Sequence, residues 1–403
     1  MNCQEIQLLE VIKDIAAGPF GSNLKVSCFV NEGFPIVDGA NLKRFKVTDN
    51  ITKFVTEEKA RSLHRSIAKR GDVIVTISGT LGQIAYIPDD SKYEEYLCSQ
   101  RQFRVTFDTT KVYVPYLVFY FHTYEGQHKI LSFANQVGVP ALSQPLKNFR
   151  QITVQLPDIE TQKKIANIVE LLNGKIEENE NINKNLAQQA QVVFQHLFED
   201  NTSVTPATIA DVALNVTDGV HNTVHDDPNG EYLLLSCKNI KGGSLSIGTS
   251  ERRINSETFE KLRRRTKLAK GDVLISSVGT VGELLLLNTE PSNYEFQRSV
   301  AIVKPNPSVV SSAYLYESLV YQKAELINAA HGAVQQCLFI SDIAGFPIGI
   351  PLSEDLKIFD EIVTPMFDAI TSNEAESIQL ATLRDTLLSK LMSGELDVSN
   401  LDL

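Results

Sequence analysis

Asp158, Glu160 and Lys163 form a cluster of side chains whose types could support catalysis. Two carboxylates and a lysine at close spacing resemble the metal-binding cluster of some nucleases. The cluster follows Pro157 at the start of a helical pattern, where acidic side chains favour the positive end of the helix dipole. We therefore interpret these residues as a helix cap rather than as a catalytic site.

Motifs of other chemistries are absent from the 403 residues. The sequence has no GxxxxGK[ST], no GxGxxG after a strand, no HExxH, no GxSxG, and no aromatic tetrapeptide of the amino-methyltransferases. The five cysteines, Cys3, Cys28, Cys98, Cys237 and Cys337, form no CxxC pair and have few histidines near them. We expect free thiols, a cytoplasmic protein, no metal, no cofactor of its own and no enzymatic activity.

Lysines and arginines gather in two stretches, and each stretch ends at a Gly-Asp-Val segment. The first holds Lys43, Arg44, Lys46, Lys53, Lys59, Arg61, Arg65, Lys69 and Arg70; the second holds Arg252, Arg253, Lys261, Arg263, Arg264, Arg265, Lys267 and Lys270. One such run is typical of an ordinary solvated face. Two runs at the same place favour contact with the phosphates of nucleic acid, whose neutralisation supplies affinity.

Other side chains have the types that recognise base edges, since arginine forks and amides pair with them in the major groove. The candidates are Ser22, Asn23, Lys25, Asn41, Arg101, His221, Asn222, Asn239, Lys241 and Arg298. Arg101 and Arg298 could equally hold a loop through internal ion pairs. The Gly-Thr-x-Gly turns could cradle phosphate or could be tight sheet turns.

The chain contains an internal repeat of about 200 residues. Gly71-Asp72-Val73 followed by Gly79-Thr80-Leu81-Gly82 recurs as Gly271-Asp272-Val273 followed by Gly279-Thr280-Val281-Gly282. Further anchors keep their order: Asn41 and Asn239, Gln100-Arg101 and Gln297-Arg298, Gly138 and Gly332, Pro157 and Pro351. Repeats of this length indicate tandem domains rather than a solenoid.

The net charge of −11 is concentrated in particular segments. Residues 1–157 carry +3 and residues 201–351 carry −2, whereas residues 158–200 carry −4 and residues 352–403 carry −8. We predict two globular domains at 1–157 and 201–351, each followed by an acidic helix at 158–200 and at 352–403. The acidity of the helices therefore does not exclude a polyanion as the ligand of the globular domains. No run of 18 apolar residues is present, so we expect no membrane span.

Each globular domain shows the pattern of an α+β fold. Predicted strands cover Phe34–Asp38, Val73–Ile77, Gln83–Ile87, Gln102–Phe107 and Ile152–Leu156, and their counterparts cover Tyr232–Ser236, Glu283–Leu287, Val300–Val303 and Phe346–Ile350. Helical patterns cover Val114–Thr123 and Ala313–Ala329.

The two acidic segments share a heptad seam with the same steps. It comprises Ile165, Val169, Leu172, Ile176, Asn179, Asn183, Leu186, Ala190, Val193 and Leu197, and, 194 residues later, Phe359, Val363, Met366, Ile370, Asn373, Ser377, Leu380, Arg384, Leu387 and Leu391. We predict an antiparallel coiled coil; the alternative is that each helix packs on its own domain. Gly174 and Pro365 predict bends, and Arg384 must reach a partner or extend to solvent.

These features together resemble the specificity subunit of a type I restriction–modification system. The matching segments are Gly18-Pro19-Phe20-Gly21-Ser22-Asn23-Leu24-Lys25, the two Gly-Asp-Val to Gly-Thr-x-Gly segments, and Gln162-Lys163-Lys164-Ile165-Ala166 after Leu156-Pro157. The order of globular domain, helix, globular domain and helix also matches, and the resemblance covers essentially the whole chain.

The resemblance implies two target recognition domains, each for one half of a bipartite target in double-stranded DNA. The helices would form a spacer that sets the gap and docks two methyltransferase subunits, and restriction subunits would join for cleavage. S-adenosylmethionine, ATP and Mg²⁺ would be bound by those partners. His221-Asn222 stand where the first domain has Pro19–Ser22, and the segments after Gly138 and Gly332 differ, so the two half-sites should differ. A protein-only scaffold and a divergent nuclease acting alone are the alternatives.

Overall fold

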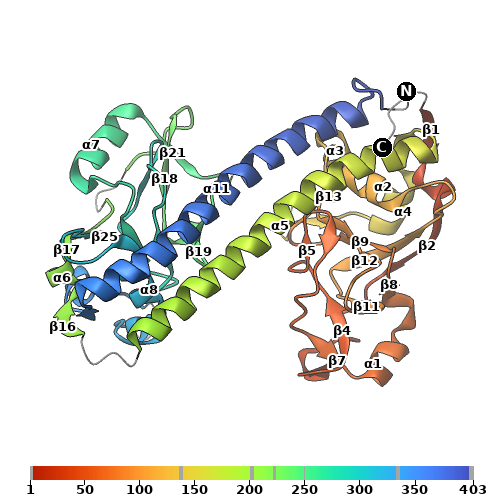
Figure 1. Cartoon of the computed structure of the whole chain (residues 1–403). Coiled ribbons are helices and arrows are strands. Elements are labelled where there is room, and N and C mark those ends of the chain that lie inside the picture. Colours follow the sequence, from red (N-terminus) through yellow and green to blue (C-terminus); the bar gives the residue numbers. More distant parts are fainter. Residues whose placement is uncertain are drawn as a thin grey trace. The chain divides into compact units, whose positions relative to one another are not determined.

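The computed structural model describes residues 3–135, 139–199, 204–220, 224–248, 250–332 and 336–398 (Figure 1). The chain forms two compact units: unit 1 is Met1–Ile176 with Ile378–Leu403, and unit 2 is Glu177–Ser377. Each unit therefore contains one globular α+β part together with segments of both long helices. Among the described residues, every helix is too short or too polar to cross a membrane.

Unit 1 is built on two sheets. The six-stranded sheet has the order β2 (Ile12–Ala17), β12 (Gln102–Phe107), β9 (Val73–Thr76), β10 (Ile84–Tyr86), β6 (Lys46–Val47) and β5 (Leu42–Lys43). The five-stranded sheet has the order β3 (Phe29–Val30), β7 (Phe54–Val55), β4 (Phe34–Val37), β11 (Glu95–Cys98) and β8 (Ile67–Lys69). Most pairs are antiparallel, but β10–β6 and β11–β4 are parallel, which gives the mixed sheets of an α+β fold.

The helices of unit 1 pack on both sheets, because Ala60 of the first helix belongs to the apolar cluster of the five-stranded sheet. They are α1 (Glu57–Ser62), α2 (Val114–Phe121), α3 (Tyr124–Leu131) and α4 (Pro145–Gln151), with 3₁₀ turns at Leu8–Glu10, Val26–Cys28 and His64–Ser66. Every residue of α2 is buried, and its side chains share one apolar core with strands β9 and β12. Two small antiparallel pairs complete the unit, β1 (Gln4–Gln7) with β15 (Thr153–Leu156) and β13 (Ala134–Asn135) with β14 (Ala141–Leu142).

Unit 2 repeats this plan. Its main sheet is β17 (Ala213–Asp218), β25 (Val300–Pro305), β22 (Val273–Ser276) and β23 (Leu284–Leu286), and its second sheet is β21 (Arg252–Ile254), β18 (Tyr232–Leu235) and β24 (Tyr294–Phe296). The remaining pairs are β19 (Ile240–Lys241) with β20 (Ser244–Leu245), and β16 (Thr205–Thr208) with β26 (Pro347–Ile350). Its helices are α6 (Ile209–Val212), α7 (Ser256–Thr266), α8 (Ser312–Tyr321), α9 (Lys323–Asn328) and α10 (Ile340–Ala344), with a 3₁₀ turn at Cys237–Asn239.

The strand pairings establish the repeat in three dimensions. In both units the Gly-Asp-Val segment opens a fully buried strand, β9 or β22, which lies between two antiparallel neighbours. Likewise β11 and β24 each pair in parallel with the strand that precedes the Asn41 or Asn239 turn. The predicted α+β fold with internal symmetry is therefore confirmed, although Ala313–Ala329 is divided into α8 and α9.

The two long helices, α5 (Ile159–Phe198) and α11 (Ser353–Met392), each contain 40 residues and run side by side (Figure 1). In unit 2 the Asn373 amide donates to Asn183 Oδ1 at 2.8 Å, and the Asn179 amide donates to Glu376 at 2.7 Å. In unit 1 the Arg384 guanidinium donates to Asn173 at 2.9 Å. Partner numbers fall on one helix as they rise on the other, so the helices are antiparallel, as predicted.

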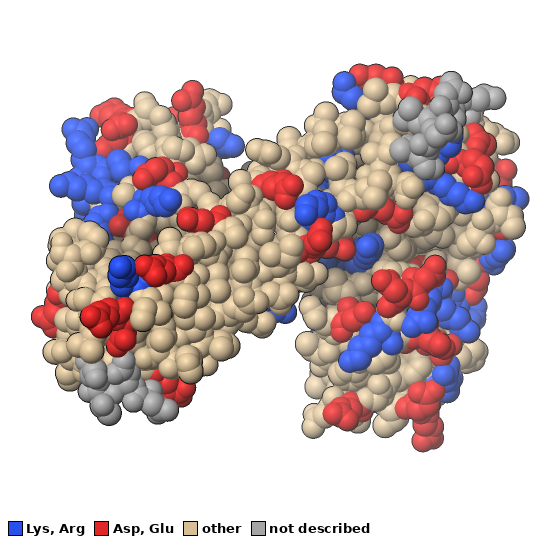
Figure 2. All heavy atoms as spheres, viewed as in Figure 1, with Lys and Arg blue, Asp and Glu red and all other residues tan. Residues whose placement is uncertain are grey.

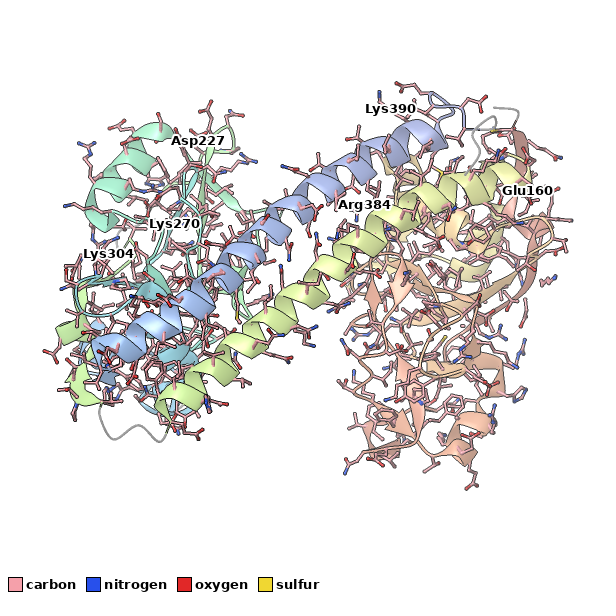
Figure 3. All side chains as sticks on the ribbon, in the orientation of Figure 1. Glu160, Asp227, Lys270, Lys304, Arg384 and Lys390 are labelled. Atoms are coloured by element: carbon pink, nitrogen blue, oxygen red, sulfur yellow. The ribbon has the colours of Figure 1, made fainter. Side chains whose placement is uncertain are left out.

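The alternative arrangement, packing of each helix on a globular part, is present as well. Ile165 and Val169 of α5 and Leu388 and Leu391 of α11 belong to the apolar core of unit 1. Arg384, the cation on the predicted seam, is buried at 6% exposure and its guanidinium lies 5.5 Å from the centre of the Phe45 ring (Figure 3). Its misfit on an apolar seam is thus resolved by a buried amide and an aromatic face.

Candidate nucleic-acid interface

In unit 1, three loops meet where β2 ends, β9 ends and β12 begins. We call Gly18–Lys25, Ile77–Gly82 and Ser99–Arg101 the unit 1 loop cluster. Gly18 N–H donates to the Gln102 carbonyl at 2.8 Å, and Ile77 N–H donates to the Arg101 carbonyl at 2.7 Å. Backbone hydrogen bonds thus hold the three loops together, and several of their polar side chains are exposed.

Unit 2 has an equivalent cluster, formed by Gly219–Val220, Ser277–Gly282 and Gln297–Ser299. Gly219 N–H donates to the Val300 carbonyl at 3.1 Å, and Ser277 N–H donates to the Ser299 carbonyl at 2.9 Å. The candidate readers His221 and Asn222 lie outside the described residues. The repeat therefore places loops from the same strand ends together in both units.

Several predicted readers are exposed in these clusters. Ser22, Asn23 and Lys25 are exposed, and so are Arg101 and Arg298, which occupy equivalent loops. The Arg101 guanidinium lies 3.7 Å from the position of a β-carbon on Gly79, so it borders the Gly-Thr-x-Gly turn. Within the described residues, no ion pair involves Arg101 or Arg298, so the internal ion-pair alternative gains no support.

Asn41 and Asn239 require a correction, because both are buried and their amides are occupied. Asn41 Oδ1 accepts from Asp38 N–H at 3.0 Å, and its Nδ2 donates to the Asn50 carbonyl at 3.0 Å. Asn239 does the same with Ser236 and Ser246. These amides stabilise equivalent turns and are occupied within them, contrary to the prediction that they face bases.

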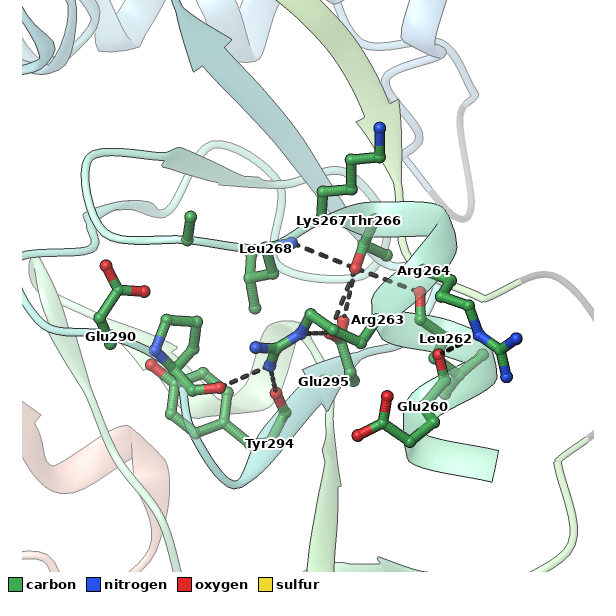
Figure 4. Close-up of polar contacts among 12 residues, drawn as sticks. Glu260, Leu262, Arg263, Arg264, Thr266, Lys267, Leu268, Glu290, Tyr294 and Glu295 are labelled. Atoms are coloured by element: carbon green, nitrogen blue, oxygen red, sulfur yellow. Dashed lines mark hydrogen bonds and ion pairs between the residues drawn. The ribbon is translucent and has the colours of Figure 1, made fainter. Parts of the chain in front are cut away.

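The second basic run forms helix α7, which Asn255 caps at its N-terminus and Lys267 ends in a left-handed conformation. Its three consecutive arginines have different partners. Arg263 forms an ion pair with Glu295, whose side chain is fully buried, and also donates to the carbonyls of Pro291 and Tyr294 (Figure 4). This is a second correction, since Arg263 holds the helix on strand β24 and is not available to a ligand.

Arg265 connects α7 to the unit 2 loop cluster. Its guanidinium donates to Asp218 at 3.0 Å and to the Gly219 carbonyl at 3.0 Å. Arg264 extends away from this network, and its only hydrogen bond among those described is to the Glu260 carbonyl within α7. The outward face of α7 thus lies next to the loops and carries exposed cations.

Figure 2 shows lysines and arginines gathered over α7. Lys261, Arg264, Lys267 and Lys270 are exposed there (Lys270 is labelled in Figure 3). Lys304 stabilises the C-terminal end of α7, because its ammonium donates to the Lys267 carbonyl and to Asp272. Arg252 and Arg253 lie on strand β21 and bond to Asp226 and to the Gly230 carbonyl.

Comparison with known proteins shows similarity to one family of DNA-specificity proteins. Residues 30–188 match the family described as the type I restriction modification DNA specificity domain. This segment is thus similar in sequence to the specificity subunits of type I restriction–modification systems. The chain is 24% identical to the Type I restriction enzyme MjaIX specificity subunit of Methanocaldococcus jannaschii, with 86% of this chain and 82% of that protein covered. It is 22% identical to the Type I restriction enzyme HindI specificity subunit of Haemophilus influenzae, with 81% of this chain and 87% of that protein covered.

The fold agrees with a solved structure of the same kind. The S subunit of a type I restriction–modification system from M. genitalium superposes with a TM-score of 0.57 at 12% identity, covering 97% of this chain and 96% of that chain. At this identity the likeness concerns the fold alone.

In unit 1 several cations of the first basic run are neutralised by ion pairs. Arg61 pairs with Glu57 and Glu95, Lys69 with Glu95, and Lys53 with Asp38. Arg70 donates to the Ser91 carbonyl. Arg65 is exposed beside the end of β2, and Lys59 is half-buried on α1. These ion pairs reduce the charge that Arg61 and Lys69 offer to a phosphate, which is a third correction.

The rest of that run lies on the β5–β6 hairpin. Lys43 and Arg44 are exposed and Lys46 is half-buried, and Lys241 is exposed on the equivalent hairpin of unit 2. Phe45 of this hairpin packs edge-on against Phe119 of α2 at 4.7 Å. The hairpin is therefore positioned by α2 and by Arg384 of α11, not by the loop cluster.

The carboxylate–lysine cluster at the start of α5 is structural. Asp158 caps α5 by accepting from Thr161 N–H at 2.9 Å, and the Thr161 contacts lower the pKa of this carboxyl. Glu160 and Lys163 pair with each other on the helix surface at 2.8 Å (Glu160 is labelled in Figure 3). Within the described ranges, no three His, Cys, Asp or Glu side chains are grouped as a metal site requires. The capping interpretation is confirmed.

Proposed function

We propose that this chain recognises a bipartite sequence in double-stranded DNA, with each unit reading one half. One observation carries the proposal: both units bring the same three loops together by equivalent backbone hydrogen bonds. In unit 2 a basic helix is joined to that cluster through Arg265. Cations beside the loops would hold phosphates and set the register, while the loop side chains reach the bases.

The readers differ between the units, so the two half-sites should differ. In unit 1 the cluster offers Ser22, Asn23, Lys25 and Arg101, whereas in unit 2 it offers Arg298 beside the cations of α7. Unit 2 therefore relies more on phosphate contacts from one helix. This concentration accounts for DNA binding by a segment whose net charge is slightly negative.

The paired helices fit the role of a spacer. A helix of 40 residues is about 60 Å long at 1.5 Å per residue. Hydrogen bonds of Asn179, Asn183 and Asn373 fix the register of the pair, and the outer faces carry most of the excess acidic charge. We place the docking of two methyltransferase subunits on these helices and add restriction subunits for cleavage.

In this proposal the chain performs no catalysis itself and acts in the cytoplasm. S-adenosylmethionine, ATP and Mg²⁺ belong to the partner subunits. The described residues give no support to a nuclease acting alone, because the carboxylate–lysine cluster caps a helix. A protein-only scaffold leaves the exposed cations of α7 without a function.

Charge reversal on α7 tests the proposal. Lys261→Glu with Arg264→Glu removes two solvent-facing cations and leaves Arg263 and Arg265 in place. If each contacts one phosphate, the slope of log K against log salt should fall by about 1.8, since each contact contributes about 0.9. The complex with the partner methyltransferase should be used, with affinity measured across a salt series.

The matched control is Lys13→Glu with Lys111→Glu, which changes the charge equally at the other end of strands β2 and β12. It should leave the slope unchanged. Equal slopes for the α7 variant and the control would refute the phosphate role. Methylome sequencing of a host carrying both subunits should show a bipartite motif, and its absence would refute sequence recognition.

A further inference from the structure

Phe20 is the large apolar side chain that the unit 1 loop cluster leaves in solvent, with 81% of its surface exposed. A side chain of this size gains free energy when it leaves water for an apolar surface. A single exposed apolar residue needs no explanation by itself. Phe20 differs from a chance case because the surrounding loop is fixed in the conformation that exposes the ring.

Both sides of Phe20 are anchored. Pro19 directly before it is buried, and Leu24 is buried in the apolar cluster that includes Phe34 and Ile36. Between these anchors, Asn23 N–H donates to the Phe20 carbonyl at 2.8 Å and closes a tight turn. The turn therefore cannot fold the ring inward without losing its anchors.

The backbone of Gly18 fixes the base of the turn. A β-carbon at Gly18 would lie 1.9 Å from the Ser99 carbonyl oxygen, so only glycine permits this approach. The contact connects the Phe20 turn directly to the loop that carries Gln100 and Arg101. Phe20 is thus presented on the same cluster as an exposed guanidinium, with Lys25 exposed five residues further on.

We propose that Phe20 is an apolar wedge that presses against a base step in the half-site of unit 1 and partly unstacks it. The inference rests on the proposed function and assigns a contact within it. Apolar side chains on DNA-binding proteins insert between base steps in this way, while neighbouring cations hold the phosphates. Arg101 and Lys25 would supply the charge, and the rigid turn would deliver the ring without an ordering cost.

The test uses the complex of this chain with its methyltransferase and a duplex that contains the methylated motif. Phe20→Ala should weaken binding about 5- to 150-fold, the range for loss of one base–aromatic stack. The salt slope should stay at the wild-type value, because the ring contacts no phosphate. Phe20→Leu, which keeps an apolar wedge, should recover much of the loss.

2-Aminopurine placed at successive positions of the half-site, outside the methylated adenine, reports unstacking. One position should brighten with wild-type complex and stay dark with Phe20→Ala. The matched control is Leu9→Ala, which removes an exposed apolar side chain at the opposite end of β2 (58% exposed) and should change neither readout.

The outcomes separate the two proposals. If the wild-type complex binds no DNA, the proposed function fails, and the wedge fails with it. If the wild type binds and Phe20→Ala binds equally well, or loses affinity with no brightened position in the wild type, the wedge alone is refuted. Loss of co-purification of the methyltransferase with Phe20→Ala would also overturn it, because the turn would then contact protein.

Discussion

Replacing Arg263 should destabilise unit 2 more than replacing its partner Glu295. The Glu295 side chain is fully buried, whereas the Arg263 side chain keeps 25% of its surface exposed. Arg263→Leu leaves a buried carboxylate with only Thr266 as a side-chain partner. Removing one member of a buried pair costs about 3–5 kcal/mol, and we expect this full cost here.

The cost of Glu295→Leu should be smaller, on the order of 1–3 kcal/mol. The remaining guanidinium can still donate to the carbonyls of Pro291 and Tyr294 and reaches solvent. Burial raises the pKa of Glu295 even with Arg263 beside it, so desolvation already exceeds the attraction of the pair. The pair therefore contributes little net stability to the folded state, although removing one partner alone leaves the other without its ion pair.

Unit 1 indicates what the double variant should do. Leu97 occupies the strand position equivalent to Glu295, and it lies in an apolar cluster against which Leu63, next to α1, packs. Arg263→Leu with Glu295→Leu copies that solution and should be neutral or up to about 4 kcal/mol more stable than wild type.

Native-state amide exchange of β24 and α7 measures these free energies, and the core strands of unit 1 serve as an internal reference. If the double variant is as unstable as the two single losses combined, or if Glu295→Leu is the more damaging, the reasoning is refuted.

Two further predictions concern groups buried in the helices. Burial raises the pKa of Glu317 on α8 from its ordinary value of 4.5 to about 8, so the folded state binds a proton that the unfolded state releases. The contribution of this group to stability should thus be fully present below pH 4.5 and be lost by about 1.4 kcal/mol per unit as pH rises towards 8. Glu317→Gln should remove this contribution, so its pH slope in urea unfolding should differ from that of the wild type by about this amount. Arg384→Leu should cost about 1–3 kcal/mol because the buried Asn173 loses its partner, and Asn173→Leu should restore much of it, as judged by thermal unfolding. A pH slope in Glu317→Gln equal to that of the wild type, or no restoration in the second case, would contradict these assignments.

The parts of this fold that repeat or keep a period were predictable from the sequence. The β-branched run after Gly71-Asp72 and its copy predicted strands β9 and β22, and the steps of four and three predicted the antiparallel helices. The roles of the basic runs were harder to predict, because the charge of a side chain does not show where that side chain points. Three successive arginines on α7 point to a buried carboxylate, to solvent and to a loop, and only the packing of the helix on β24 decides which.

The residues predicted to contact bases show the same limit of prediction from residue type. Asn41 and Asn239 have the side chains of base readers, but a turn nine or seven residues long captures both amides. Phe20 carried no signal as an apolar residue, since its exposure follows from anchors at Pro19 and Leu24. Residue type indicates which chemistry is possible, and the local backbone decides whether it is available.

The discontinuity of unit 1 has a consequence for the order of folding during synthesis. Leu388, Leu391 and Val398 complete an apolar core whose other buried members precede residue 170, whereas unit 2 is one uninterrupted stretch, Glu177–Ser377. Domains generally form as they leave the ribosome, starting from the amino end. Unit 2, although made later, can therefore fold first, while the core of unit 1 stays open and accessible to chaperones until the last turns of α11 and the segment after them have been made.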